Sequence, residues 1–159
     1  MNREQAIQYI LDKHGTDALY IFPTGYISRT AYRLCKERYT AFYMQGSMGC
    51  APAIGLGIAI CRKDKNIVVV NGDGALLMSM GTTHTIDENN LSNFFHYVLD
   101  NGCYESVGGQ KCSKLLYSYP GVTEIIKTIY NEDKDERVGI DPLSNTEKVI
   151  EFLKEGKNE

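Results

Sequence analysis

The clearest indication of the fold is the stretch of residues 67–74, Ile67-Val68-Val69-Val70-Asn71-Gly72-Asp73-Gly74. Its four consecutive β-branched residues predict a buried strand over 67–70, and the small and polar residues that follow end that strand. We expect a single helix from Ala75 to about Ile86. A buried strand that passes through a glycine turn into a helix is typical of α/β proteins.

The same alternation extends to both sides of this stretch. Three more short apolar runs predict buried strands: 18–22, 42–44 and 94–99. The other expected helices run over 3–13, from a capping Ser28 to about Lys36, over 50–61, and from Asp141 onward. Helix 50–61 is expected to be buried, with glycines that allow close packing. The pattern predicts one α/β domain over residues 1–159, a doubly wound parallel sheet with helices on both faces.

Composition and charge exclude several function classes. The 159 residues are 43% hydrophobic and 23% charged, which is ordinary for a globular domain. The net charge is -3 and no basic stripe is present, so we expect no nucleic-acid partner. No segment is apolar enough to span a membrane, and the N-terminus lacks a signal-peptide core. The five cysteines form no C-x-x-C pair, so we expect a cytoplasmic protein with reduced thiols and no membrane partner.

Glycines and polar residues follow three of the predicted strands, at 23–25, 71–74 and 100–103. In a parallel sheet these positions share one edge, where such folds bind ligands. Gly72 and Gly74 allow a sharp turn, and N–H groups at the start of the next helix can hold a phosphate. Asp73 and, 28 positions later, Asn101 offer oxygen ligands that suit Mg²⁺. A simple turn explains Gly72-Asp73-Gly74 equally well at this point.

Taken together, these stretches resemble the thiamine-diphosphate motif, in which G-D-G is followed after just under thirty residues by asparagine. The family usually has Asn-Asn where this chain has Asp100-Asn101. Three further stretches are similar to the phosphonopyruvate and sulfopyruvate decarboxylases: Tyr43-Met44-Gln45-Gly46-Ser47-Met48-Gly49, Thr24-Gly25 with Ser28-Arg29, and Glu105-Ser106-Val107-Gly108-Gly109-Gln110. The resemblance covers roughly residues 4 to 111 and implies a thiamine-diphosphate-binding fold.

The resemblance also implies roles for particular residues. Mg²⁺ is expected to be bound by Asp73, Asn101 and the backbone carbonyl of Cys103. Met48 is expected to support the bent cofactor, and the carbonyl of Gly46 to accept a hydrogen bond from the pyrimidine amino group. Core packing is the alternative role for Met48. The expected cofactor contacts are Thr24, Gly25, Gly46, Ser47, Met48, Gly72, Asp73, Gly74, Ala75, Asn101, Cys103 and Tyr104.

The loop over 105–110 is expected to meet the anionic end of a substrate. Ser106 and the N–H groups of Gly108 and Gly109 suit a phosphonate or sulfonate, although a loop without a ligand is an equally open interpretation. The implied reaction is decarboxylation of a short 2-oxo acid, with phosphonopyruvate to phosphonoacetaldehyde and CO₂ favoured over sulfopyruvate. The alternative function is a non-catalytic nucleotide-binding or regulatory α/β module.

At two points the family pattern has a structural part that this chain is expected to lack or to have remodelled. The family has a further helix and strand after the position of Gln110, whereas here only 111–136 fills that space, so we expect a missing or remodelled edge element. The family also needs a glutamate at the pyrimidine ring, which lies on a different domain. No glutamate here fits that position and no segment before residue 4 can hold that domain. We therefore expect a pyrimidine-binding partner subunit that supplies the glutamate.

Overall fold

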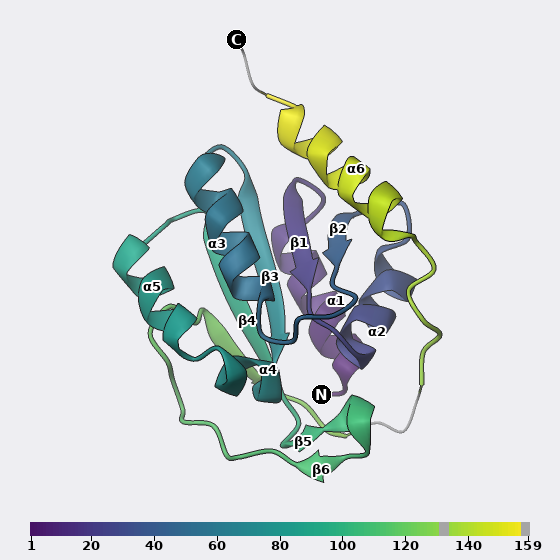
Figure 1. The fold of residues 1–159 in the computed structure, drawn as a ribbon, viewed down its shortest axis with the longest axis vertical. Coiled ribbons are helices and arrows are strands. Elements are labelled where there is room, and N and C mark those ends of the chain that lie inside the picture. Colours follow the sequence, from purple (N-terminus) through teal and green to yellow (C-terminus); the bar gives the residue numbers. More distant parts are fainter. Residues whose placement is uncertain (131–133, 157–159) are drawn as a thin grey trace.

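A five-stranded, all-parallel sheet forms the centre of the computed structural model, which describes residues 1–130 and 134–156 (Figure 1). The strand order is β2-β1-β3-β4-β7. The strands are β1 (Ala18–Phe22), β2 (Thr40–Tyr43), β3 (Asn66–Gly72), β4 (Phe94–Asp100) and β7 (Glu124–Lys127). The expected domain also included residues 131–133 and 157–159, which lie outside the described residues.

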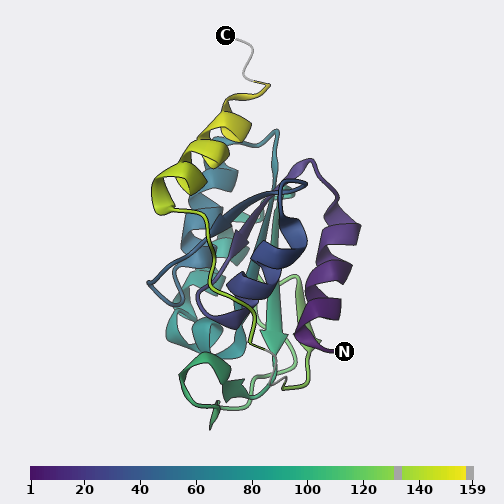
Figure 2. The ribbon, with the colours of Figure 1, turned by 90° about the vertical axis from the view of Figure 1, so that its right-hand side faces the viewer.

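Helices cover both faces of this sheet, as Figure 2 shows edge-on. One layer contains α1 and α2, and the opposite layer contains α3, α5 and α6. Their bounds, with α4, are α1 (Arg3–His14), α2 (Tyr26–Cys35), α3 (Ala51–Cys61), α4 (Asp73–Met78), α5 (Gly81–Asn89) and α6 (Pro142–Lys154). A small antiparallel ribbon follows β4, with β5 (Cys103–Tyr104) and β6 (Gln110–Lys111) flanking a 3₁₀ turn, η1 (Glu105–Val107). The predicted doubly wound fold is confirmed.

β3 is buried on both sides because each face has its own layer of helices. Val68 and Val70 pack in the core beneath α1 and α2, while Ile67 and Val69 pack in the core beneath α3. Gly55 allows the approach of α3, since a Cβ atom there would overlap Cγ2 of Val69. Continuous β-branched sequence therefore reflects two-sided burial, as expected for a parallel sheet.

Two of the expected helices differ in the structure. α2 begins at Tyr26 rather than after a capping Ser28, because Gly25, at φ +84°, makes the turn. Ser28 is buried within the first turn. α3 is only half-buried, since its outer face leaves Ile54 and Ile60 37% and 44% exposed. Apolar composition all round the helix suggested full burial, but only one of its faces lies on the sheet.

The expected helix over 75–86 is two helices in the structure. α4 ends at Met78, and α5 begins at Gly81. Ser79 stands at the break, where its Oγ donates to the carbonyl of Gly49 at 2.6 Å and to that of Ala75 at 3.2 Å. These bonds attach the end of α4 to the loop that precedes α3, a constraint that the local sequence does not reveal.

The edge of the sheet beyond β4 is remodelled. A strand is nevertheless present there, β7, which pairs with β4 in parallel. Residues 112–123, all of them described, contain no helix. Leu115 instead packs with Leu76 and Val98 in a small core of its own, and Tyr119 and Val122 pack against it. The crossover from β4 to β7 is therefore packed coil over these residues. Across the described part of the chain, every helix is too short or too polar to cross a membrane.

Candidate cofactor-binding site

The carboxyl ends of β1, β3 and β4 meet α4 and the β5–β6 ribbon at one end of the sheet, as the strand ends predicted (Figure 1). A cavity of about 100 Å³ lies there. The sequence-predicted residues that line it are Thr24, Met48, Gly72, Asp73, Gly74, Ala75, Asn101, Cys103, Tyr104 and Ser106. A larger groove of about 1190 Å³ is lined by α2, α6 and residues of the segment 134–141. None of the sequence-predicted site residues lines this larger groove.

Five predicted residues lie beside the cavity rather than in its wall: Gly25, Gly46, Ser47, Gly108 and Gly109. A Cβ atom at Gly25 would lie 3.0 Å from the Ser106 Oγ, so the turn between β1 and α2 is in close contact with η1. Gly46 and Ser47 are exposed on the connection from β2 to α3. The N–H of Gly109 donates to the carbonyl of Tyr104 at 3.0 Å, so this donor is engaged within its own loop.

Asp73 is the central charged group of the cavity and is only 5% exposed. Its Oδ1 accepts from the Gly74 N–H at 2.7 Å, and its Oδ2 accepts from the Gly102 N–H at 2.8 Å. Burial raises the pKa of this carboxyl, and nearby Asp100 raises it further. Within residues 1–130 and 134–156 no basic side chain forms an ion pair with it. A buried carboxylate without a counter-ion is unfavourable by itself, so its surroundings fit a bound cation.

Asn101 and Cys103 lie beside Asp73 and add oxygen atoms to its surroundings. The Asn101 Oδ1 accepts from the Cys103 N–H at 3.0 Å, and its Nδ2 donates to Glu105 Oε2 at 3.2 Å. The described residues contain no group of three or more His, Cys, Asp or Glu side chains placed to hold a metal. One carboxylate with amide and carbonyl oxygens is nevertheless the kind of set that suits Mg²⁺, which usually keeps waters and substrate oxygens as its other ligands.

Asp100, the departure from the family's asparagine, has its own counter-ion. Lys127 of β7 forms an ion pair with Asp100 Oδ2, and Asp100 Oδ1 accepts from the Gly102 N–H at 3.1 Å. The remodelled edge strand therefore balances the additional negative charge next to Asn101.

Gly74, Tyr104 and Met48 form the apolar part of the cavity wall. A Cβ atom at Gly74 would overlap the Tyr104 ring and lie 3.2 Å from Cε of Met48, so only glycine fits beneath both side chains. Met48 itself is 36% exposed. The core-packing role is therefore wrong for Met48, which lies at the rim of the cavity.

We expect Met48→Ala to reduce turnover of the assembled enzyme more than it weakens cofactor binding. Because Met48 is not in the core, the free energy of unfolding should fall by less than about 1 kcal/mol. Met44→Ala is the matched control: it truncates a methionine of the same connection that is 8% exposed, and should cost about 2–5 kcal/mol. Denaturant unfolding and rate measurements on both variants separate the two roles. A large stability loss in Met48→Ala with turnover per folded molecule intact would contradict the assignment.

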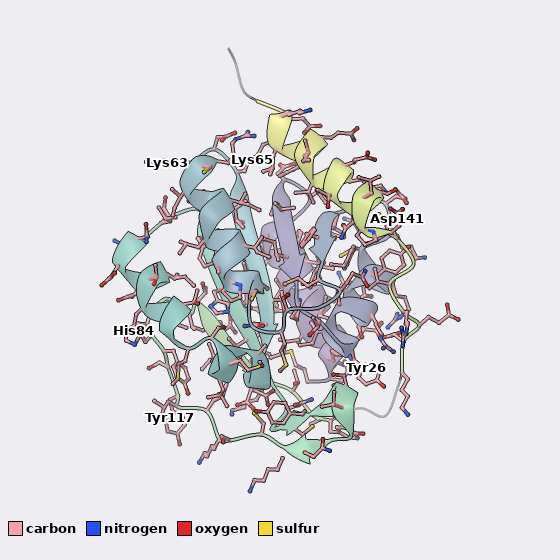
Figure 3. The ribbon with its side chains drawn as sticks, viewed as in Figure 1. Tyr26, Lys63, Lys65, His84, Tyr117 and Asp141 are labelled. Atoms are coloured by element: carbon pink, nitrogen blue, oxygen red, sulfur yellow. The ribbon has the colours of Figure 1, made fainter. Side chains whose placement is uncertain are left out.

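Sequence reasoning placed Glu105 in the loop near the site but missed Arg3 and its pairing with Glu105. Arg3 is 4% exposed and donates from Nη1 to Glu105 Oε2 at 2.8 Å. The one signal was its position in the first turn of α1, where a cation opposes the helix dipole. Tyr26 also lines the cavity; Figure 3 shows it at the start of α2, beside η1, whereas His84 stands on α5 at a distance from this end.

Comparison with known proteins shows the family of this chain. Residues 24–134 match the family model described as "Thiamine pyrophosphate enzyme, C-terminal TPP binding domain". The chain belongs to this family. The matched segment contains every sequence-predicted site residue, and the resemblance stated from the sequence is confirmed. Thiamine diphosphate is the cofactor of TPP-binding domains, so the cavity at the sheet edge is the place to test for it.

Several curated relatives of this TPP-binding domain are named as decarboxylases. Over 156 residues it is 35% identical to sulfopyruvate decarboxylase subunit beta of Methanocaldococcus jannaschii, covering 98% of this chain and 76% of that protein. It is 38% identical over 120 residues to phosphonopyruvate decarboxylase of Streptomyces viridochromogenes, covering 76% of this chain but 30% of that protein. It is 39% identical to the sulfopyruvate decarboxylase subunit beta of Methanothermobacter thermautotrophicus, covering 59% of this chain and 50% of that protein.

Proposed function

We propose that this chain is the diphosphate-binding subunit of a thiamine-diphosphate-dependent decarboxylase that acts on a short 2-oxo acid. The observation that carries the proposal is the buried carboxylate of Asp73, which lacks a basic partner among the described residues and lies in a glycine-lined cavity. The relatives named as decarboxylases support the type of reaction. The alternative of a nucleotide-binding module loses support, because Gly55 and Gly57 lie inside α3 rather than on a strand-to-helix turn.

In this proposal Mg²⁺ is held by Asp73, Asn101 and the backbone carbonyl of Cys103. The N–H groups of Gly74 and Ala75, together with Thr24 and Gly25, hold the diphosphate, and the Gly74 N–H then shares or exchanges its bond to Asp73 Oδ1. Ser47, Gly72 and Tyr104 complete the contacts, Gly46 accepts a hydrogen bond from the pyrimidine amino group, and Met48 supports the bent shape. When bound, thiamine diphosphate supplies the electron sink for loss of CO₂. The protein contributes orientation, charge balance and exclusion of water.

A partner subunit is part of the proposal because the cavity is small. Pockets that enclose a drug-sized ligand have volumes of about 300–1000 Å³, whereas this cavity measures about 100 Å³. The chain therefore has room for one end of the cofactor, and we propose that a pyrimidine-binding subunit encloses the other end and supplies the activating glutamate. Relatives named as subunit beta support this arrangement. Exposed apolar side chains on α3, at the end of α4 and between α4 and α5 offer a surface for that partner: Ile54, Met78 and Met80.

We propose a substrate with a sulfonate or phosphonate end, near Ser106, Gly108 and Gly109. The amino-acid sequence of the loop over 105–110 favours phosphonopyruvate. Similarity along 98% of the chain to a sulfopyruvate decarboxylase subunit favours sulfopyruvate. Charge also favours the sulfonate, which has one negative charge where a phosphonate has up to about two. Arg3 is the one lysine or arginine among the described residues that line the cavity, and it is bonded to Glu105. Sulfopyruvate is therefore the first substrate to assay.

Thermal unfolding with different ligands tests the cofactor part of this proposal. We expect Mg²⁺ with thiamine diphosphate to raise the unfolding midpoint of the chain, because a ligand that binds only the folded state stabilises it by mass action. Mg²⁺ with ATP, or NAD, should leave the midpoint unchanged. A response to ATP or NAD alone would favour the regulatory module instead. Rates of CO₂ release from sulfopyruvate and phosphonopyruvate, measured with the partner subunit present, then identify the substrate.

A further inference from the structure

A chain of buried polar contacts joins the N-terminal helix to the loop after β4. Arg3 of α1 donates from Nη1 to Glu105 Oε2 at 2.8 Å and from Nε to Thr30 Oγ1 of α2 at 2.8 Å. The side chains of Arg3 and Glu105 are only 5% and 11% exposed. Figure 1 shows the N-terminus at the same end of the sheet as α4 and β5. The contact therefore links the cavity to α1, which is not one of the strands whose ends form the site.

Glu105 contacts Asn101 as well as Arg3. The Asn101 Nδ2 donates to Glu105 Oε2 at 3.2 Å. A carboxylate only accepts hydrogen bonds, so the Asn101 amide must turn its NH₂ group toward Glu105 and its oxygen away. That oxygen accepts from the Cys103 N–H at 3.0 Å, which occupies one of its two lone pairs and leaves the other for a cation.

Stability alone is a weak reason for this ion pair. Burying two charges costs desolvation energy that their attraction only roughly offsets, and apolar replacements of such pairs are often neutral or stabilising. Arg3 also lies in the first turn of α1, where the helix dipole disfavours a cation. A second role, in fixing the side chain that Glu105 contacts, accounts for the pair at this place.

We infer that Arg3 and Glu105 are positioning residues that present the amide oxygen of Asn101 to the bound divalent cation. Arg3 holds Glu105, and Glu105 fixes the orientation of the Asn101 amide. The inference rests on the proposed function, which assigns Asn101 as a ligand of Mg²⁺. It extends that function to the N-terminal helix, which lies outside the family match at 24–134.

The test replaces both partners, so that neither charge is left buried alone. In Arg3→Met/Glu105→Leu, Asp135 loses its contact with Arg3 Nη2 at 3.9 Å but still accepts from Arg33 Nε at 2.7 Å, so its charge keeps a partner. We expect affinity for thiamine diphosphate with Mg²⁺, measured by calorimetry on the full chain, to fall about 10–100-fold, with the ligand-free unfolding midpoint little changed. The matched control is Arg62→Met/Asp64→Leu, another largely buried arginine with a carboxylate partner, at the opposite end of the sheet. Its affinity should not change.

Coupling to Asn101 distinguishes positioning from general stabilisation. The triple variant, which adds Asn101→Ala to the double variant, should bind the cofactor as well as Asn101→Ala alone. The reason is that the Arg3–Glu105 pair is inferred to act on the metal only through the Asn101 Oδ1. The side-chain ¹H–¹⁵N signals of Asn101, identified by their loss in Asn101→Ala, should shift in the Arg3/Glu105 variant and stay in place in the control. Glu105→Gln, which keeps the shape of the side chain, should give a smaller loss and serves if the double variant does not fold.

The outcomes separate this inference from the proposed function. If the wild-type chain binds neither thiamine diphosphate nor inorganic diphosphate with Mg²⁺, the proposed function fails and this inference fails with it. If the wild-type chain binds and the folded Arg3/Glu105 variant binds equally well, or its loss adds to that of Asn101→Ala, only the positioning role is overturned.

Discussion

Asp73→Ala is expected to weaken Mg²⁺-dependent binding of thiamine diphosphate by about 100-fold or more. Even residues that only orient metal ligands change metal affinity by about 10–100-fold, and Asp73 is the one carboxylate proposed as a direct ligand. Without it the metal would rest on neutral amide and carbonyl oxygens, which compensate less of its charge. Calorimetric titration of the variant with cofactor at fixed Mg²⁺ measures the change.

The fold should survive this substitution. The Gly102 N–H donates to Asp100 Oδ1 at 3.1 Å as well as to Asp73 Oδ2, so this donor keeps a partner when Asp73 is replaced. Burial raises the pKa of the Asp73 carboxyl in the folded state. At pH values above the pKa that this carboxyl has in the unfolded chain, its ionisation therefore lowers the free energy of unfolding. Alanine removes that cost but also leaves the Gly74 N–H without its acceptor, so the ligand-free unfolding midpoint at neutral pH should change little. Asp87→Asn, an exposed carboxylate on α5, is the control and should change neither quantity. Undiminished cofactor affinity in Asp73→Ala would refute the metal assignment.

The purified chain, supplied with Mg²⁺, thiamine diphosphate and either 2-oxo acid, is expected to show no steady release of CO₂. The cofactor makes different demands at its two ends. Its diphosphate end needs a cation and N–H donors, which the cavity at α4 provides. Its pyrimidine end needs a carboxylate at a ring nitrogen for the proton exchange that activates it. Glu105 is the one glutamate among the described residues that line the cavity, and it is engaged with Arg3 and Asn101.

Activity should return when a pyrimidine-binding subunit is added. When the partner subunit is added in increasing amounts to a fixed amount of this chain, the rate of CO₂ release should rise. The rate should level off once all copies of this chain have bound a partner. Replacing the activating glutamate of that subunit by glutamine should abolish turnover in the mixture while cofactor binding persists. Steady decarboxylation by this chain without the partner would overturn the two-subunit proposal. Two glutamates of the chain, Glu132 and Glu159, lie outside the described residues.

Local sequence predicted most of the fold because the signals are local. Four β-branched residues in succession have no favourable place except a strand covered on both faces, and β3 is such a strand. The break at Ser79 escaped prediction, because it depends on hydrogen bonds to the distant carbonyl of Gly49 as well as to that of Ala75. The half-exposed α3 escaped for a related reason: apolar composition does not tell which faces have neighbours.

The strand ends are the part of the site that follows from the local sequence. Parallel strands place their carboxyl ends on one edge, so Gly72, Asp73 and Asn101 had to converge there once the strands were recognised. The charge balance around these residues, in contrast, depends on how distant segments pack. Lys127 reaches Asp100, and Arg3 reaches Glu105, from segments with no sequence signal that links them. Ion pairs between distant segments depend on how the sheet edge and the helices pack, which sequence periodicity does not encode.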